Sequence, residues 1–271
     1  MNNHTIAKNI LIHKQIGEVV SEFNRENIDF ILLKGAALIE IFPDYAFSRD
    51  MEDIDILVKK RSFLMAKHIL INIGYSCAIE DPGAFFKQGF PARIDLCDGL
   101  WYLDRSENIL LFKEAKIFFD ISVLSPEDFY IHVFAHAFLH HARRERAWLD
   151  DLALLSERWA ETIDKKTLSL KIKKYGFDRV SSNPFYNWFL DKEIPLKGHI
   201  FRFFFLPVRK KFLYINDLLF PSVDFLTGRY SLRGFGQVVC FRIIRPAMLL
   251  FQFLRFLTGV VGSLFLRTQS T

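Results

Sequence analysis

Two aspartates separated by a single residue are the most chemically informative residues of the sequence. Asp53 and Asp55 lie at the start of an apolar run, residues 54–58, that indicates a buried β-strand. Because side chains alternate between the two faces of a strand, both carboxylates should point to one side. Like charges this close are unfavourable unless a cation compensates them. Hard oxygen ligands on one face are what Mg²⁺ bound to substrate phosphates requires.

A third carboxylate at a strand end would complete a two-metal site. Asp95 lies on a later expected strand, residues 93–96, and is the natural candidate, with Asp98 as the weaker alternative. Two metal ions held by Asp53, Asp55 and Asp95 could activate an attacking hydroxyl and stabilise the pyrophosphate that leaves a nucleoside triphosphate. A solvated strand end can carry the same aspartate pair, so the pair indicates a metal site only in combination with the motifs around it.

The segment before the aspartates is suited to phosphate binding. Residues 30–33 form an expected buried strand, Lys34 and Gly35 follow it, and a helix is expected over residues 36–41. A glycine at this junction lets a phosphate approach the backbone, and the helix N-terminus adds amide donors. Lys34 and Arg49 could counter the triphosphate charge, Arg49 through its bidentate fork.

This combination resembles a family of uncharacterised nucleotidyltransferases that have a DNA polymerase β-like fold. The shared residues are Leu32, Leu33, Lys34, Gly35, Pro43, Arg49, Asp53 and Asp55. The family's later acidic strand matches at Asp95 and Leu96, but Cys97 stands where the family has a histidine. The resemblance implies transfer of a nucleoside monophosphate from an NTP, with ATP expected, to an unknown hydroxyl or phosphate acceptor. Two Mg²⁺ ions and release of pyrophosphate are implied as well, and a natural-product or polysaccharide pathway is compatible with the family.

The resemblance extends from residue 30 to about 155, and more loosely to 221. Its later part comprises a Ser-Pro-Glu-Asp helix start, three histidines and a Trp-Leu-x-Asp-Leu stretch: Ser125, Pro126, Glu127, Asp128, His132, His136, His140, Trp148, Leu149, Asp151 and Leu152. The chain lacks the HExxH signature and an obvious third ligand, so we interpret the histidines as packed between domains or near the nucleotide. Asp151 is expected to pair with one of them or with Arg143 or Arg144.

The order of elements predicts an α+β fold: a mixed sheet with flanking helices, followed by a helical C-terminal domain. An amphipathic helix should open the chain, residues 62–73 should form another, and residues 117–123 should form a strand. A helix should run from residue 125 to about 159, with later breaks at Pro184, Pro195, Pro207 and Pro221. We expect a nucleotidyltransferase core over residues 1–123, a helical domain over 124–221 and a basic, Phe-rich amphipathic segment over 222–271.

The charge of the chain is unevenly distributed. The 271 residues have a net charge of +5, yet residues 197–271 contain eleven basic and two acidic residues, with 13 of the 30 phenylalanines. Such a segment could bind an anionic membrane, bind nucleic acid, or pack its aromatic rings inside with arginines reaching outward. In the most apolar window, residues 246–266, Arg255 near the middle favours a buried or interfacial helix over a membrane span.

Several other classes of protein are disfavoured. Three scattered cysteines are too few for a disulfide framework or a CxxC zinc site, and the N-terminus does not resemble a signal peptide, so a cytoplasmic protein is expected, with the inner membrane face as a peripheral location. A GxSxG elbow and a P-loop are both missing from the sequence. The alternatives left open are a toxin-like nucleotidyltransferase acting on tRNA or protein, and a non-catalytic nucleotide- or membrane-binding module.

Overall fold

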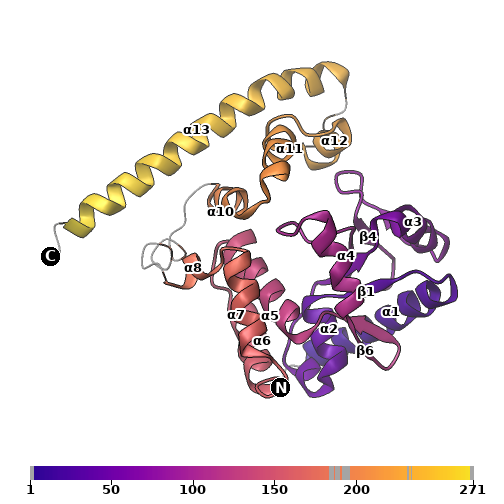
Figure 1. Cartoon of the computed structure of the whole chain (residues 1–271). Helices are drawn as coiled ribbons and strands as arrows, with labels where there is room; N and C mark the ends of the chain where they lie inside the picture. The colour runs from indigo at the N-terminus through magenta and orange to yellow at the C-terminus, as the bar shows by residue number, and fades with distance from the viewer. Residues whose placement is uncertain are drawn as a thin grey trace.

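The computed structural model describes residues 3–182, 186, 190, 196–230, 232 and 234–268 (Figure 1). Its helices are α1 (Asn3–Arg25), α2 (Lys34–Ile41), α3 (Phe63–Asn72), α4 (Arg105–Glu114), α5 (Pro126–Phe134), α6 (Arg146–Arg158), α7 (Lys165–Lys174), α8 (Asp178–Ser182), α10 (Lys197–Phe205), α11 (Val208–Leu219), α12 (Val223–Tyr230) and α13 (Phe235–Thr268). Its strands are β1 (Phe30–Leu32), β2 (Asp53–Val58), β3 (Ser76–Cys77), β4 (Ala84–Phe86), β5 (Arg93–Cys97), β6 (Lys116–Phe118) and β7 (Ile121–Val123). Short 3₁₀ turns (Pro43–Phe47 and Lys60–Ser62) and a π-helix (Ala135–His140) complete the described elements.

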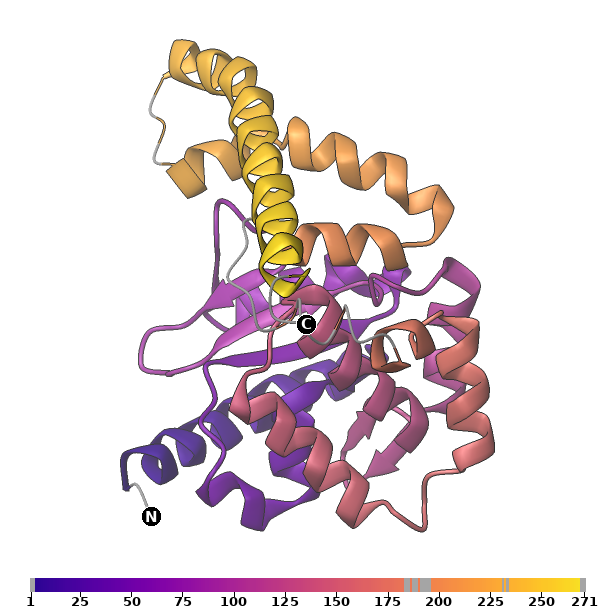
Figure 2. The same cartoon turned by 90° about the vertical axis from the view of Figure 1, so that its left-hand side faces the viewer.

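The described strands form one mixed seven-stranded sheet in the order β3-β4-β5-β2-β1-β7-β6. β2 pairs parallel with β5 and antiparallel with β1, which in turn pairs parallel with β7. The sheet and its flanking helices occupy the first half of the chain, and the second half is helical (Figures 1 and 2). The predicted α+β class, with a helical C-terminal region after the sheet, is therefore confirmed.

The central elements form where the hydrophobic pattern predicts them. The opening helix α1 buries an apolar stripe spaced by three and four residues, which includes Ile12, Ile16, Val19 and Phe23. All three residues of β1 are buried, as its continuous apolar run predicts. The strand predicted over residues 54–58 and the helix predicted over 36–41 are present as β2 and α2, with boundaries that differ by one or two residues.

Two elements between β5 and α5 differ from the prediction. The single strand expected over residues 117–123 is a hairpin of β6 and β7, because Phe119 adopts a left-handed conformation with φ 51° and turns the chain. Helix α4 was missed, although its start carries a capping box in which Asp104 and Glu107 each bind the other's backbone amide.

The continuous helix expected from residue 125 to about 159 is also wrong. Its start is as predicted, since the Ser125 side chain accepts a hydrogen bond from the Asp128 amide. After α5, however, the chain widens into the π-helix, and Ala142 then adopts a left-handed φ of 51° before α6 begins. A π-helix is rare and often accompanies a functional site.

Buried side chains link the sheet to the helices that follow it. One apolar cluster runs from Ile12 to Val180 and so crosses residue 123. A second cluster joins Ala142, Leu190, Phe201 and Phe256. The domain boundaries at residues 123 and 221 stay a prediction.

The prolines interrupt the helices only in part. Pro207 immediately precedes α11 and Pro221 lies between α11 and α12, as expected. Pro184 and Pro195 lie outside the described residues. Pro246, expected to begin the apolar helix, lies instead inside α13.

Candidate active site

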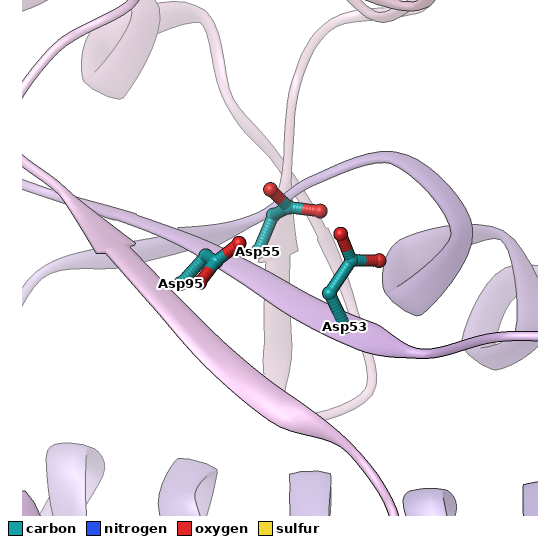
Figure 3. Close-up of side chains that lie close together, drawn as sticks. All are labelled: Asp53, Asp55 and Asp95. Carbon is teal, nitrogen blue, oxygen red and sulfur yellow. The ribbon is translucent and has the colours of Figure 1, made fainter. Parts of the chain in front are cut away.

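Three carboxylates converge at the centre of the sheet. Asp53 and Asp55 project from the same face of β2, and the parallel register with β5 places Asp95 directly beside Asp55 (Figure 3). One carboxylate oxygen from each residue lies within 4.8 Å of those of the other two. The predicted convergence is confirmed. Asp98, the weaker alternative, instead forms an ion pair with Lys60 at 3.9 Å.

The electrostatics of this triad call for a cation. Burial raises the pKa of Asp55 to about 6; Lys34 opposes the shift and the neighbouring Asp53 adds to it. Burial also raises the pKa of Asp95, although a 2.6 Å ion pair with Arg93 partly offsets this. Among the described residues, Asp95 Oδ1 is buried and has no hydrogen-bond partner. A divalent cation would give this oxygen a ligand bond and relieve the repulsion, so the residues present fit a metal.

Lys34 places a largely buried positive charge beside the triad. Its Nζ lies 2.6 Å from Asp55 Oδ1 and 3.4 Å from His136 Nδ1. Burial disfavours the charged amine, but Asp55 and Asp53 outweigh burial and raise the pKa of Lys34. Its backbone has a φ of 49°, a conformation that costs a non-glycine residue free energy and that recurs at functional sites.

Gly35 and Arg49 lie side by side at the N-terminus of α2. A Cβ atom built on Gly35 would lie 3.5 Å from Arg49 Nη2 and 3.5 Å from Met51 Sδ. These are ordinary contact distances, so protein packing alone does not demand a glycine here. The predicted roles of Gly35 and Arg49 in binding phosphate stay predictions.

Arg49 is held by an aspartate 102 residues away. Its Nε and Nη2 atoms donate to the two carboxylate oxygens of Asp151 at 2.8 and 3.1 Å, and the Tyr45 hydroxyl donates to the same carboxylate at 2.8 Å. These partners of Asp151 are not among those expected from the sequence, which were a histidine, Arg143 or Arg144. Tyr45 was missed because nothing local in the sequence marks it as a partner of α6.

We expect Arg49→Lys to destabilise the protein by about 1–3 kcal/mol, because lysine keeps the charge but loses the bidentate geometry around a carboxylate that is only 1% exposed. Tyr45→Phe, which removes one hydrogen bond to the same carboxylate, should cost about 1 kcal/mol. Urea denaturation of both variants measures these changes. Wild-type stability in Arg49→Lys would contradict the importance of the fork.

A cluster of histidines lines the site behind Lys34. The rings of His136 and His141 lie 4.5 Å apart, and Trp148 stacks on His141 at 4.7 Å. Burial lowers the pKa of His132 to about 3, and the charge of Lys34 is the second cause. Burial likewise lowers the pKa of His140 to about 3, with Arg202 as the second cause. Among the described residues the aspartate triad is the group that could hold a metal, and the histidines do not form one. His136 contacts Lys34, and the expected position of the histidines between domains or near the nucleotide stays a prediction.

A basic cavity opens beyond the ends of β2 and β5. It has a volume of about 480 Å³, and its charged lining residues are Lys59, Lys60, Arg61, Arg105, Lys210 and Asp98. The triad carboxylates do not line it. Its excess of positive charge would attract anionic ligands.

Comparison with known proteins supports the chemistry that this geometry indicates. A family model described as "Uncharacterised nucleotidyltransferase" matches residues 2–186, which is more than half of the chain. No curated protein and no solved structure matches the chain. An acidic triad of this kind is typical of nucleotidyltransferases that use divalent metals. The chain belongs to this uncharacterised nucleotidyltransferase family and is therefore a transferase of the EC 2.7.7 class.

Proposed function

We propose that the protein transfers a nucleoside monophosphate from ATP or another NTP to a hydroxyl or phosphate acceptor, releasing pyrophosphate. The observation that carries this proposal is the meeting of three carboxylates on two adjacent parallel strands, beside a buried lysine, in a chain of a nucleotidyltransferase family. A natural-product or polysaccharide acceptor is compatible with the family, and the identity of the acceptor is the first question for experiment.

In this proposal Asp53, Asp55 and Asp95 hold Mg²⁺, with two ions expected. Bound Mg²⁺ would neutralise phosphate charge and favour ionisation of the acceptor hydroxyl. The unpartnered Oδ1 atom of Asp95 and the raised pKa of Asp55 both support a ligand role, since each group gains from a nearby cation. Loss of any one carboxylate would leave the set of ligands incomplete.

The remaining residues of the site bind the triphosphate. The Lys34 amine, which pairs with Asp55 in the free protein, would turn to a phosphate oxygen once a metal neutralises the carboxylates. The amides at the start of α2, with Gly35 in its first turn, would donate to another phosphate. Arg49, fixed by Asp151, would hold a positive charge beside Gly35.

The direct test is to incubate the protein with Mg²⁺ and each labelled NTP, and to measure pyrophosphate and labelled products in the presence of a cell lysate as the source of acceptor. We expect activity with ATP that disappears in EDTA and in Asp53→Ala. Glu52→Ala is the matched control, because it removes an exposed carboxylate from the adjacent position and should keep activity. Unchanged activity in Asp53→Ala would overturn the assignment.

A further inference from the structure

Helix α13 packs on the protein with a single narrow stripe. The side chains that are buried or half-buried lie along one side of the helix: Val238, Phe241, Arg242, Arg245, Pro246, Leu249, Gln252 and Phe256. Arg242 and Arg245 donate to the backbone oxygens of Pro221 and Leu218, at 3.0 and 2.9 Å. Phe256 joins the cluster that contains Phe201. The helix is thus attached along one side, and it lies outside the sheet-containing part of the molecule (Figures 1 and 2).

The other side of α13 is exposed and apolar. Its exposed residues include Val239, Ile243, Ile244, Met248, Leu250, Phe251, Phe253, Leu254 and Leu257. Ile243 is 71% exposed and Phe251 is 63% exposed. A continuous apolar surface of this extent on a folded protein marks a binding face.

The polarity of α13 differs from that of a helix on a water-facing surface. Such a helix turns apolar residues inward and polar residues outward. Here two arginines and a glutamine share the covered stripe with apolar residues, and the outward side carries mostly large aliphatic and aromatic residues. The exposed face is therefore built for an apolar environment and not for water.

The charge of α13 identifies that environment. The helix contains four arginines and no acidic residue. Next to it, α11 exposes Val208 and Phe212 and carries three consecutive basic residues, Arg209, Lys210 and Lys211. A bilayer with anionic lipids offers an apolar interior and negative phosphates in a single partner, and this matches both features.

The attachment of α13 decides how it would meet the bilayer. Residues Phe235–Thr258 are long and apolar enough to cross a membrane, with a mean hydropathy of 1.4 and 6% of the window buried. However, the contacts of Arg242, Arg245 and Phe256 tie this same window to the protein along its length. A helix held in this way lies parallel to a membrane surface.

We propose that α13 is an interfacial membrane anchor whose outward apolar face enters the acyl boundary of an anionic bilayer. The exposed basic residues Arg209 of α11 and Arg255 of α13 contact the lipid phosphates. This location would place the protein in the cytoplasm at the inner face of the membrane, with its site held near acceptors that reside there. The inference does not depend on nucleotidyl transfer, so each proposal can fail alone.

Flotation of the full chain with vesicles tests the anchor. Wild-type protein should float with vesicles of phosphatidylcholine and phosphatidylglycerol, and far less with phosphatidylcholine alone. Ile243→Asp combined with Phe251→Asp should reduce flotation at least tenfold, because both charges lie on the exposed apolar face. Leu64→Asp combined with Ile79→Asp is the matched control: both residues are 69% exposed on the sheet-containing part, so flotation should be unchanged.

Two measurements without vesicles test the other possible partners of the exposed face. The molecular mass in solution tests for a second copy of the chain, and an RNA-binding assay tests for RNA. Monomeric wild type that floats, with equal circular dichroism melts for both double variants, supports the anchor. Equal flotation of the two double variants would overturn it. So would a wild-type dimer that Ile243→Asp with Phe251→Asp dissociates without any flotation, or binding to RNA in place of vesicles.

Discussion

Asp55→Asn should lose nucleotidyl transfer at least a thousandfold and yet be more stable than the wild type above pH 6. The loss follows because the amide cannot replace a carboxylate as a charged metal ligand at the centre of the triad. The gain follows because burial, reinforced by Asp53, disfavours the charge of Asp55 more than the ion pair with Lys34 favours it, so removing the charge stabilises the folded protein. Loss of activity accompanied by increased stability distinguishes a functional residue from a structural one.

The pH dependence of this gain has a definite sign. Burial, opposed by Lys34 and reinforced by Asp53, raises the pKa of Asp55 from 3.8 to about 6 in the folded protein. The folded state then binds the proton more tightly than the unfolded state does, so the contribution of Asp55 to stability is full below pH 3.8 and is lost as pH rises through about 6. Asparagine escapes this loss and should be more stable by about 1–3 kcal/mol at pH 8.

Urea denaturation at pH 4 and pH 8, in EDTA, measures the effect. The two proteins should differ at pH 8 and converge towards pH 4. Added Mg²⁺ should raise the melting temperature of the wild type at pH 8 and leave that of Asp55→Asn nearly unchanged. Equal Mg²⁺ shifts in both proteins would show that the metal binds elsewhere.

The triad was predictable because its geometry is local. Alternation along one strand puts Asp53 and Asp55 on one face, and a single parallel pairing adds Asp95. The contact of Lys34 with Asp55 follows from similarly simple topology, since β1 pairs with β2 and Lys34 comes just after β1. Most of the candidate site could therefore be predicted from the sequence, because its residues lie on regular strands or directly after them.

The parts that were missed depend on long-range packing or on single backbone conformations. The contacts of Asp151 with Arg49 and Tyr45 join residues more than 100 positions apart, and no local pattern encodes such a pairing. The turn at Phe119 and the break at Ala142 each depend on one residue other than glycine in a left-handed conformation. Propensity argues against that conformation, so it becomes evident only when the surrounding structure is known.

Helices α4 and α13 were misjudged for different reasons. The capping box of α4 was present in the sequence at Asp104 and Glu107, so that helix could have been found. For α13, the expected start at Pro246 follows the general cost of proline inside a helix. Arg242 and Arg245 lie in the turn before this proline. Their hydrogen bonds to Pro221 and Leu218 hold that part of the helix on the protein.

The histidine behind the site should make the protein sensitive to acid. His132 is buried, and among the described residues neither of its ring nitrogens has a hydrogen-bond partner. Burial, assisted by the charge of Lys34, lowers the pKa of His132 from 6.5 to about 3. Since the folded state resists protonation, the stability that neutral His132 provides is present above pH 6.5 and is lost as pH falls below it.

His132→Phe should remove this dependence, because phenylalanine fills a similar volume beside Tyr102, whose ring stacks on His132 at 6.3 Å, and carries no titratable group. Each pH unit between 6.5 and 3 costs the wild type about 1.4 kcal/mol at this residue, so the variant should be more stable by about 3 kcal/mol at pH 4.5. Urea denaturation from pH 8 to pH 4.5 gives the slope for each protein. His68→Phe, a change on the exposed side of α3, should keep the wild-type slope. The buried carboxylates Asp55 and Asp95 remain in all three proteins, so their contributions cancel and the difference in slope reports on His132 alone. Parallel curves for the wild type and His132→Phe would contradict the prediction, because they would show that His132 is protonated as readily in the folded state as in the unfolded one.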